Sequence, residues 1–146
     1  MLFRSLAAYF IEKNDADDHA STLASFERVL HKKEAIVQRE TDLLLRNIED
    51  VSFEKLFSDK IEHYSRLFEK EGIAFLIYDN DTLKFWTDHS IAVENYLKEV
   101  CLDDRLVQLK NGWFEVMKKY SQPKGTRGVF GLILLKKEYE IGRAHV

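Results

Sequence analysis

Few residues in this sequence have the types and spacing that catalysis requires. The run Asp88-His89-Ser90 contains the three residue types of a catalytic triad, but triad members converge from separate elements, so a polar strand end is the preferred interpretation. The chain has no phosphate-binding loop, no nucleophile elbow and no HExxH motif. A small hydrolase that uses Asp88, His89 or Glu115 is therefore the least favoured function, and we expect no catalytic residues in this chain.

Metal and cofactor sites are likewise not indicated. His31 and His63 have no partner at ligand spacing, and a single cysteine excludes an internal disulfide framework. The acidic residues Asp79, Asp81 and Asp103-Asp104 lack the calcium-loop pattern, and their turn-forming tendency explains them better. We therefore expect neither a bound metal nor a cofactor.

Three aromatic residues are candidate ligand-binding residues. Trp86 and Trp113 each share a predicted strand face with charged residues, and Tyr78 ends an apolar run. A large aromatic side chain on a polar face either lines a pocket or lies under a covering loop. Packing is the commoner reason for an aromatic residue in a sheet, so both interpretations stay open. A pocket lined by all three would suit an apolar or planar small molecule.

The composition is that of one globular domain. The chain has 146 residues, of which 45% are hydrophobic, and this length can bury a core without disulfide or metal cross-links. The net charge of −3 gives no basic footprint for nucleic acid. No run reaches the roughly 18 apolar residues that a membrane span needs.

Glycine and proline divide the chain into a helical half and a strand-rich half, because neither occurs before Gly72. Apolar residues recur every seven positions from Leu23 to Leu44 and predict a helix over about 16–48. Ser52 is a good N-cap and Gly72 a good C-cap for a second helix over about 52–70.

The second half predicts a sheet over about 73–137. One hairpin joins 73–78 to 83–86 through an Asp/Asn-rich turn, and another joins 106–110 to 113–118 through Asn111-Gly112. A short helix is expected near 91–101. The final strand, 129–135, is apolar on both faces and therefore central. We predict an α+β fold, in which both helices pack on one face of a five-stranded, mainly antiparallel sheet.

The two ends of the chain have the features of a cloning artefact. Residues 1–5 back-translate to GTG CTC TTC CGA TCT, and residues 141–146 to ATC GGA AGA GCA CAC GTC. The first string is largely the reverse complement of the second, and both match a common sequencing adapter. We therefore expect 1–5 and 141–146 to be adapter-derived and 6–140 to be a single domain. Ordinary coding DNA that continues in frame past Glu140 would contradict this.

Several segments carry a family resemblance. Residues 78–88 (YDNDTLKFWTD), 111–116 (NGWFEV) and 131–136 (GLILLK), with 26–34 (FERVLHKKE) at the start of the long helix, are similar to one group of proteins. The chain resembles the extracytoplasmic sensor region of bacterial membrane-bound sensor histidine kinases, over about Leu23 to Tyr139.

The resemblance implies a PAS-like or Cache-like sensor domain between two membrane spans, on the periplasmic side of the inner membrane. It implies a non-catalytic input domain of a two-component system that relays a small-molecule or mechanical signal to a downstream kinase module. The implied partners are a second copy of the chain and, through that module, a response regulator. His31 and His63 lie outside any phospho-acceptor motif.

A cytoplasmic PAS-like module for protein interaction or dimerisation is the alternative. The free thiol of Cys101 and the lack of a signal sequence favour it. DNA encoding roughly 20 apolar residues before Leu6 would instead favour the membrane-tethered sensor.

A domain tethered between two membrane spans must also satisfy a geometric condition. A helix over 16–48 is about 50 Å long and exceeds the width of a small sheet. If both ends return to one membrane surface, the start of this helix, near 16–20, must lie on the same side of the domain as residues 136–139.

Overall fold

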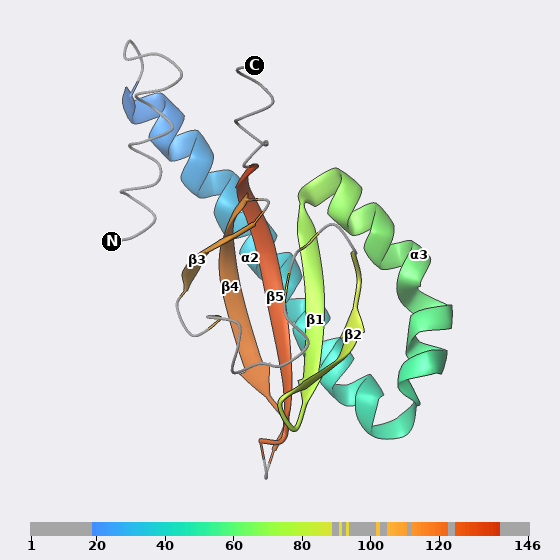
Figure 1. Ribbon diagram of the computed structural model, residues 1–146. Helices are drawn as coiled ribbons and strands as arrows, with labels where there is room; N and C mark the ends of the chain where they lie inside the picture. Colours follow the sequence, from blue (N-terminus) through green and yellow to red (C-terminus); the bar gives the residue numbers. More distant parts are fainter. Residues whose placement is uncertain are drawn as a thin grey trace, which may run out of the picture.

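A computed structural model of the chain describes residues 19–88, 91, 93, 102, 105–110, 112–122 and 125–137. The helix expected near 91–101 and the adapter-like ends fall outside these residues, apart from Ile91 and Val93. Both predicted long helices and all five strands are present (Figure 1). No described helix combines the length and the apolar character that a membrane crossing requires.

Two helices form the first half of the described chain. Helix α2 spans His19–Asp50 and helix α3 spans Phe53–Glu71. Ser52 caps α3 as predicted, because its hydroxyl accepts a hydrogen bond from the Lys55 backbone N–H at 3.2 Å. Gly72 ends α3 in the left-handed region, with φ of 67°. The cap signals in the sequence therefore mark both ends of α3.

The sheet is antiparallel throughout. Its strands are β1 (Ile73–Asp79), β2 (Thr82–Trp86), β3 (Leu106–Leu109), β4 (Gly112–Tyr120) and β5 (Arg127–Lys137), in the order β2-β1-β5-β4-β3. Asn80 and Asp81 form the first turn with φ of 49° and 74°, the left-handed conformations that Asp and Asn tolerate. Gly112, which we predicted in the second turn, is instead the first residue of β4 and pairs with Leu109.

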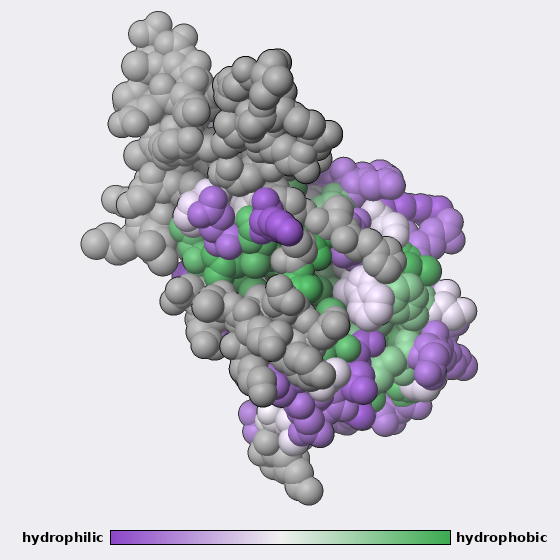
Figure 2. All heavy atoms as spheres, viewed as in Figure 1, coloured by the Kyte–Doolittle hydropathy of each residue, from purple (hydrophilic) through white to green (hydrophobic). Residues whose placement is uncertain are grey.

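The sheet carries a different core on each face. The face toward the helices forms the helix-facing core, made of Leu30, Val37, Leu44, Ile48, Leu56, Tyr64, Ile73, Phe75, Ile77, Phe85, Val129 and Ile133. The opposite face forms the far-face core, made of Ala74, Leu76, Tyr78, Ile91, Leu102, Val107, Phe114, Val116, Phe130 and Leu132. Figure 2 shows apolar side chains gathered on this second face. The central strand β5 contributes to both cores, as its continuous apolar run predicted.

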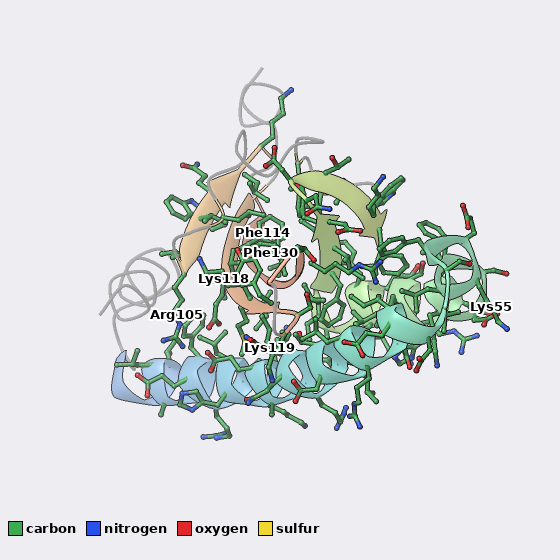
Figure 3. The ribbon with its side chains drawn as sticks, turned by 90° about the horizontal axis from the view of Figure 1, so that it is seen from below. Lys55, Arg105, Phe114, Lys118, Lys119 and Phe130 are labelled. Atoms are coloured by element: carbon green, nitrogen blue, oxygen red, sulfur yellow. The ribbon has the colours of Figure 1, made fainter. Side chains whose placement is uncertain are left out.

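Helix α2 lies along one side of the sheet (Figure 3), and it runs antiparallel to β5 (Figure 1). Near its C-terminal end, the Ile48 carbonyl accepts a 2.6 Å hydrogen bond from Arg127, the first residue of β5. In its middle, Val37 packs against Gly131, where an added Cβ would lie 2.3 Å from Val37 Cγ1. Glycine at position 131 thus allows the helix to approach the central strand.

The start of α2 and the end of β5 lie at the same end of the domain (Figure 1). The 32 residues of α2 span about 48 Å, whereas the 11 residues of β5 span about 36 Å. The first turns of the helix therefore project beyond the sheet. This is the arrangement that we predicted, seen here for His19 and Lys137 rather than for the residues beyond them.

Candidate functional site

The structure places the three candidate aromatic residues at separate positions. Tyr78 is 1% exposed in the far-face core, with its ring centroid 5.7 Å from that of Phe130 in an edge-to-face contact. Trp113 is partly buried in β4 and belongs to neither core. Because β1 and β5 separate β2 from β4, roughly 14 Å lies between the strands of Trp86 and Trp113. Among the described residues, the groove that Trp86 borders is lined by neither Tyr78 nor Trp113.

Trp86 alone borders an open groove. The centroid of its ring lies 5.8 Å from that of Phe57, with an angle of 76° between the ring planes. This contact joins the end of β2 to α3. The groove has a volume of about 730 Å³ and lies between the first turns of α3 and the edge strand β2. Its lining residues are Phe53, Glu54, Phe57, Ser58, Asp79, Lys84 and Trp86. We call this the aromatic groove.

Charges border the aromatic groove without filling it. The guanidinium carbon of Arg127 lies over the Phe53 ring, 5.4 Å from its centroid. The Nε of Arg127 donates a hydrogen bond to Asp79 at 3.3 Å. Lys84 is exposed on β2, so its ammonium group reaches solvent at the groove's edge. The groove therefore combines aromatic walls with a lysine at its edge that can pair with an anionic group and, from α3, the carboxylate of Glu54.

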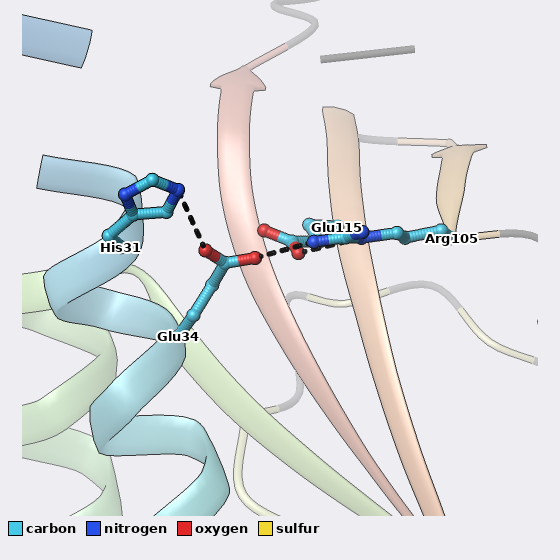
Figure 4. Close-up of polar contacts among 4 residues, drawn as sticks. All are labelled: His31, Glu34, Arg105 and Glu115. Carbon is cyan, nitrogen blue, oxygen red and sulfur yellow. Dashed lines mark hydrogen bonds and ion pairs between the residues drawn. The ribbon is translucent and has the colours of Figure 1, made fainter. Parts of the chain in front are cut away.

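A second polar site lies between α2 and the sheet (Figure 4). Arg105, just before β3, donates from Nη2 to Glu34 of α2 at 2.9 Å and from Nε to Glu115 of β4 at 3.3 Å. His31 Nε2 lies 3.9 Å from the other oxygen of Glu34. We call Glu34, Arg105 and Glu115 the carboxylate cluster.

Burial in the carboxylate cluster is very uneven. The Glu115 side chain is 0% exposed, that of Glu34 is 15% exposed and that of Arg105 is 60% exposed. Glu115 Oε2 is buried and accepts no hydrogen bond within the described part of the chain. A buried carboxyl oxygen without a donor is costly if it carries charge, so this oxygen is the natural position for a proton.

The pKa values of the two carboxyl groups move in opposite directions. Burial raises the pKa of Glu115 to about 8, and the hydrogen bond and negative charge of Glu34 add to the rise. Burial also opposes ionisation of Glu34, but its hydrogen bonds with Glu115 and Arg105 outweigh this and lower the pKa of Glu34. Two ionised carboxylates can only accept hydrogen bonds. A hydrogen bond between the two carboxyl groups therefore requires a proton, and the raised pKa of Glu115 makes its carboxyl group the one that would hold it.

No family model, no curated protein and no solved structure matches this chain. Within the described residues, no group of three or more His, Cys, Asp or Glu side chains could hold a metal ion.

The structure does not bring Asp88 and Glu115 together. Asp88 follows β2, whereas Glu115 lies on β4, and two strands stand between them. That separation of roughly 14 Å exceeds hydrogen-bond reach by a wide margin. His89 lies outside the described residues.

A further buried glutamate joins the two helices. Glu40 of α2 is 8% exposed. Its Oε2 accepts a hydrogen bond from the Tyr64 hydroxyl of α3 at 3.3 Å, and its Oε1 lies 3.4 Å from His63 Nε2. Burial, followed by the charge and hydrogen bond of Glu40, raises the pKa of Tyr64 above its ordinary value. Lys33 reaches α3 as well, donating to the Glu71 carbonyl at 2.7 Å. Lys33 and Glu40, two polar residues of α2, thus both contact α3.

Sequence reasoning missed the carboxylate cluster. Alternation along the strand predicts that Glu115 shares the polar face of Trp113, but α2 covers Glu115 and buries its carboxyl group. The signal that could have indicated it is a charged residue between the apolar Phe114 and Val116.

Proposed function

We propose that this chain is a signal-sensing input domain without catalysis of its own. The observation that carries the proposal is the course of α2. It packs on the central strand β5 and runs antiparallel to it, so the start of the helix and the end of the strand leave the domain at one end. A change in how the helix lies on the sheet would then alter the relation between the two exit points.

We infer further that the domain belongs to a membrane-tethered sensor histidine kinase. The sequence resemblance and the long first helix on a five-stranded antiparallel sheet support this inference. In that setting the domain is extracytoplasmic, a second copy of the chain is the partner within the membrane protein, and a response regulator receives the signal through the kinase module.

The aromatic groove is the proposed ligand site. Trp86 and Phe57 offer flat apolar walls and Lys84 offers a positive charge at the edge. A planar molecule with an anionic substituent matches these features, since its ring stacks on the aromatic side chains and its charge pairs with the lysine. Tyr78 and Trp113 are not part of this groove as described.

A thermal-shift screen of planar carboxylates and phosphates against the purified chain tests this proposal. A ligand that binds only the folded state raises the melting temperature in a concentration-dependent manner. We expect Trp86→Ala to abolish the shift and Trp113→Phe, on the other side of β5, to preserve it.

Two results would overturn the proposal. One is a shift that survives Trp86→Ala and Lys84→Ala alike, which would place the ligand elsewhere. The other is turnover of a compound at a rate abolished by a point substitution, which would make the chain an enzyme.

Exposed apolar residues on α2 favour a second candidate, a module for protein interaction or dimerisation. Val29 is 53% exposed and Leu43 is 39% exposed, and they lie two heptads apart with the partly buried Ile36 between them. Light scattering at increasing concentration tests self-association, and we expect Val29→Glu with Leu43→Glu to abolish any dimer. The DNA upstream of Leu6 distinguishes a tethered from an untethered protein.

A further inference from the structure

The carboxylate cluster is one of the polar links between the first half of α2 and the sheet. Glu34 comes from α2, Glu115 from β4, and Arg105 precedes β3 and contacts both (Figure 4). The buried carboxyl of Glu115 thus faces a carboxyl group from another element. One arginine serves two carboxyl groups, so its single positive charge balances only one of them.

The charged surroundings of Glu115 are few among the described residues. Helix α2 contributes Glu34, with His31 beside it, and the residue before β3 contributes Arg105. The neighbour on β5 is the apolar Ile133. The next ion pair between α2 and β4 joins Asp42 to Lys119, about 12 Å further along the helix than Glu34.

We propose that Glu34 and Glu115 form a proton-operated contact that sets how closely the first half of α2 lies on the sheet. With one proton, the pair makes a carboxylic acid–carboxylate hydrogen bond, and Arg105 neutralises the remaining charge. Without the proton, two carboxylates face each other beside one arginine, and the cluster carries a net negative charge. Repulsion and the demand for hydration then move the two elements apart.

The helix is the element that moves. Strand β4 is held on both sides by backbone pairing with β3 and β5, whereas the first half of α2 is attached through side chains. A half-open pocket of about 190 Å³ lies between this part of the helix and the end of β5. Phe26, Leu30 and Lys33 line it from α2, and Ile133 and Leu135 line it from β5. The helix is therefore less closely packed here than at the contact between Val37 and Gly131.

Nuclear magnetic resonance of the ¹³C,¹⁵N-labelled chain between pH 4 and pH 9.5 tests the inference. We expect the Glu115 carboxyl to titrate more than one pH unit above the exposed glutamates. The backbone amides between Phe26 and Val37 should shift with the same midpoint. In Glu115→Gln these amide shifts should vanish, because glutamine donates a hydrogen bond to Glu34 at every pH.

A second variant, Glu34→Gln, should leave Glu115 able to titrate but at a lower pH. In Glu34→Gln the negative charge beside Glu115 is lost and the new amide can donate to it, so the Glu115 midpoint should fall by more than one pH unit. This variant also carries the test if Glu115→Gln fails to fold. The control Glu62→Gln, at an exposed ion-pair residue of α3, should behave as the unsubstituted chain does.

Two outcomes would overturn the inference. If Glu115 titrates together with the exposed glutamates, the pair does not hold a proton. If Glu115 titrates at high pH while the amides of α2 stay unchanged, the pair is a static contact. Neither outcome bears on ligand binding in the aromatic groove, so this inference stands or falls separately from the proposed function.

Discussion

Replacing Glu115 with glutamine should change how the stability of this protein depends on pH. Glutamine has nearly the same shape as a protonated glutamic acid and carries no charge at any pH. Its carbonyl can accept from Arg105, and its amide can donate to Glu34, as the protonated carboxyl does. The variant therefore fixes the carboxylate cluster in its protonated arrangement.

The sign of the effect follows from proton binding. The pKa of Glu115 is about 8 in the folded protein, against an ordinary value of 4.5. Between these two pH values the folded state holds a proton that the unfolded state has released, so the free energy of unfolding falls as pH rises. The stabilisation is complete below about pH 4.5 and is lost by about pH 8. Glu34, whose pKa is lowered, changes stability only at more acidic pH.

The magnitude has an upper limit of about 1.4 kcal/mol per pH unit, or about 5 kcal/mol over the whole window. Water that reaches the cluster beside the exposed Arg105 reduces this value, because it hydrates the ionised carboxylates. We therefore expect the unsubstituted chain to lose about 2–3 kcal/mol between pH 5 and pH 8 through this group. Glu115→Gln should lose none of it.

Urea unfolding at pH 5, 6, 7, 8 and 9, followed by circular dichroism, measures this difference. The slope of the free energy of unfolding against pH is the diagnostic quantity. The second amide hydrogen of glutamine finds no partner in the cluster and costs about 1 kcal/mol at every pH. Relative to the unsubstituted chain, the variant should therefore be slightly less stable at pH 5 and more stable at pH 9.

A matched control distinguishes this mechanism from general charge effects. Glu62 is 81% exposed and pairs with Arg66 on the surface of α3, so Glu62→Gln removes the same charge without touching the cluster. Its stability should follow that of the unsubstituted chain across the pH range. Parallel curves for the unsubstituted chain and Glu115→Gln would refute the reasoning, since Glu115 would then be ionised in the folded state.

Three further substitutions test the packing of the helices, each by urea unfolding at pH 7. Gly131→Ala should lower stability by about 1–3 kcal/mol, because the new methyl group collides with Val37, and Val37→Ala in the same chain should recover part of the loss. Tyr64→Phe should cost about 1–2 kcal/mol, because the buried Glu40 loses a hydrogen bond. Ser52→Ala should cost about 1 kcal/mol through the lost N-cap of α3.

The elements of the fold were predictable where their signals are local. Ser52 and Gly72 bracket α3 by their own side-chain and backbone chemistry, without reference to distant residues. Asn80 and Asp81 specify the first hairpin turn in the same way. The position of β5 in the sheet centre followed from its apolar run, since only a strand covered on both faces needs one.

The candidate site was not predictable, because it depends on how elements far apart in the sequence are rotated relative to one another. Whether Glu34 faces Glu115 or solvent depends on the angle at which α2 lies on the sheet. That angle depends in turn on the close contact between Val37 and Gly131. The aromatic groove likewise depends on the position of α3 beside β2, which brings Phe57 to Trp86 and leaves Trp113 apart.

The same geometry makes a small shift at the carboxylate cluster large at the start of the helix. Val37 is fully buried against Gly131 and fixes α2 three residues beyond Glu34, or about 4.5 Å along the axis. His19, the first residue of α2, lies on the same side of Val37 as Glu34, about 27 Å from Val37 along the helix axis. For a rigid helix that pivots at Val37, a displacement of about 0.5 Å at Glu34 becomes about 3 Å at His19. The start of the helix is thus the part of α2 that would be displaced furthest when the Glu34–Glu115 pair loses its proton.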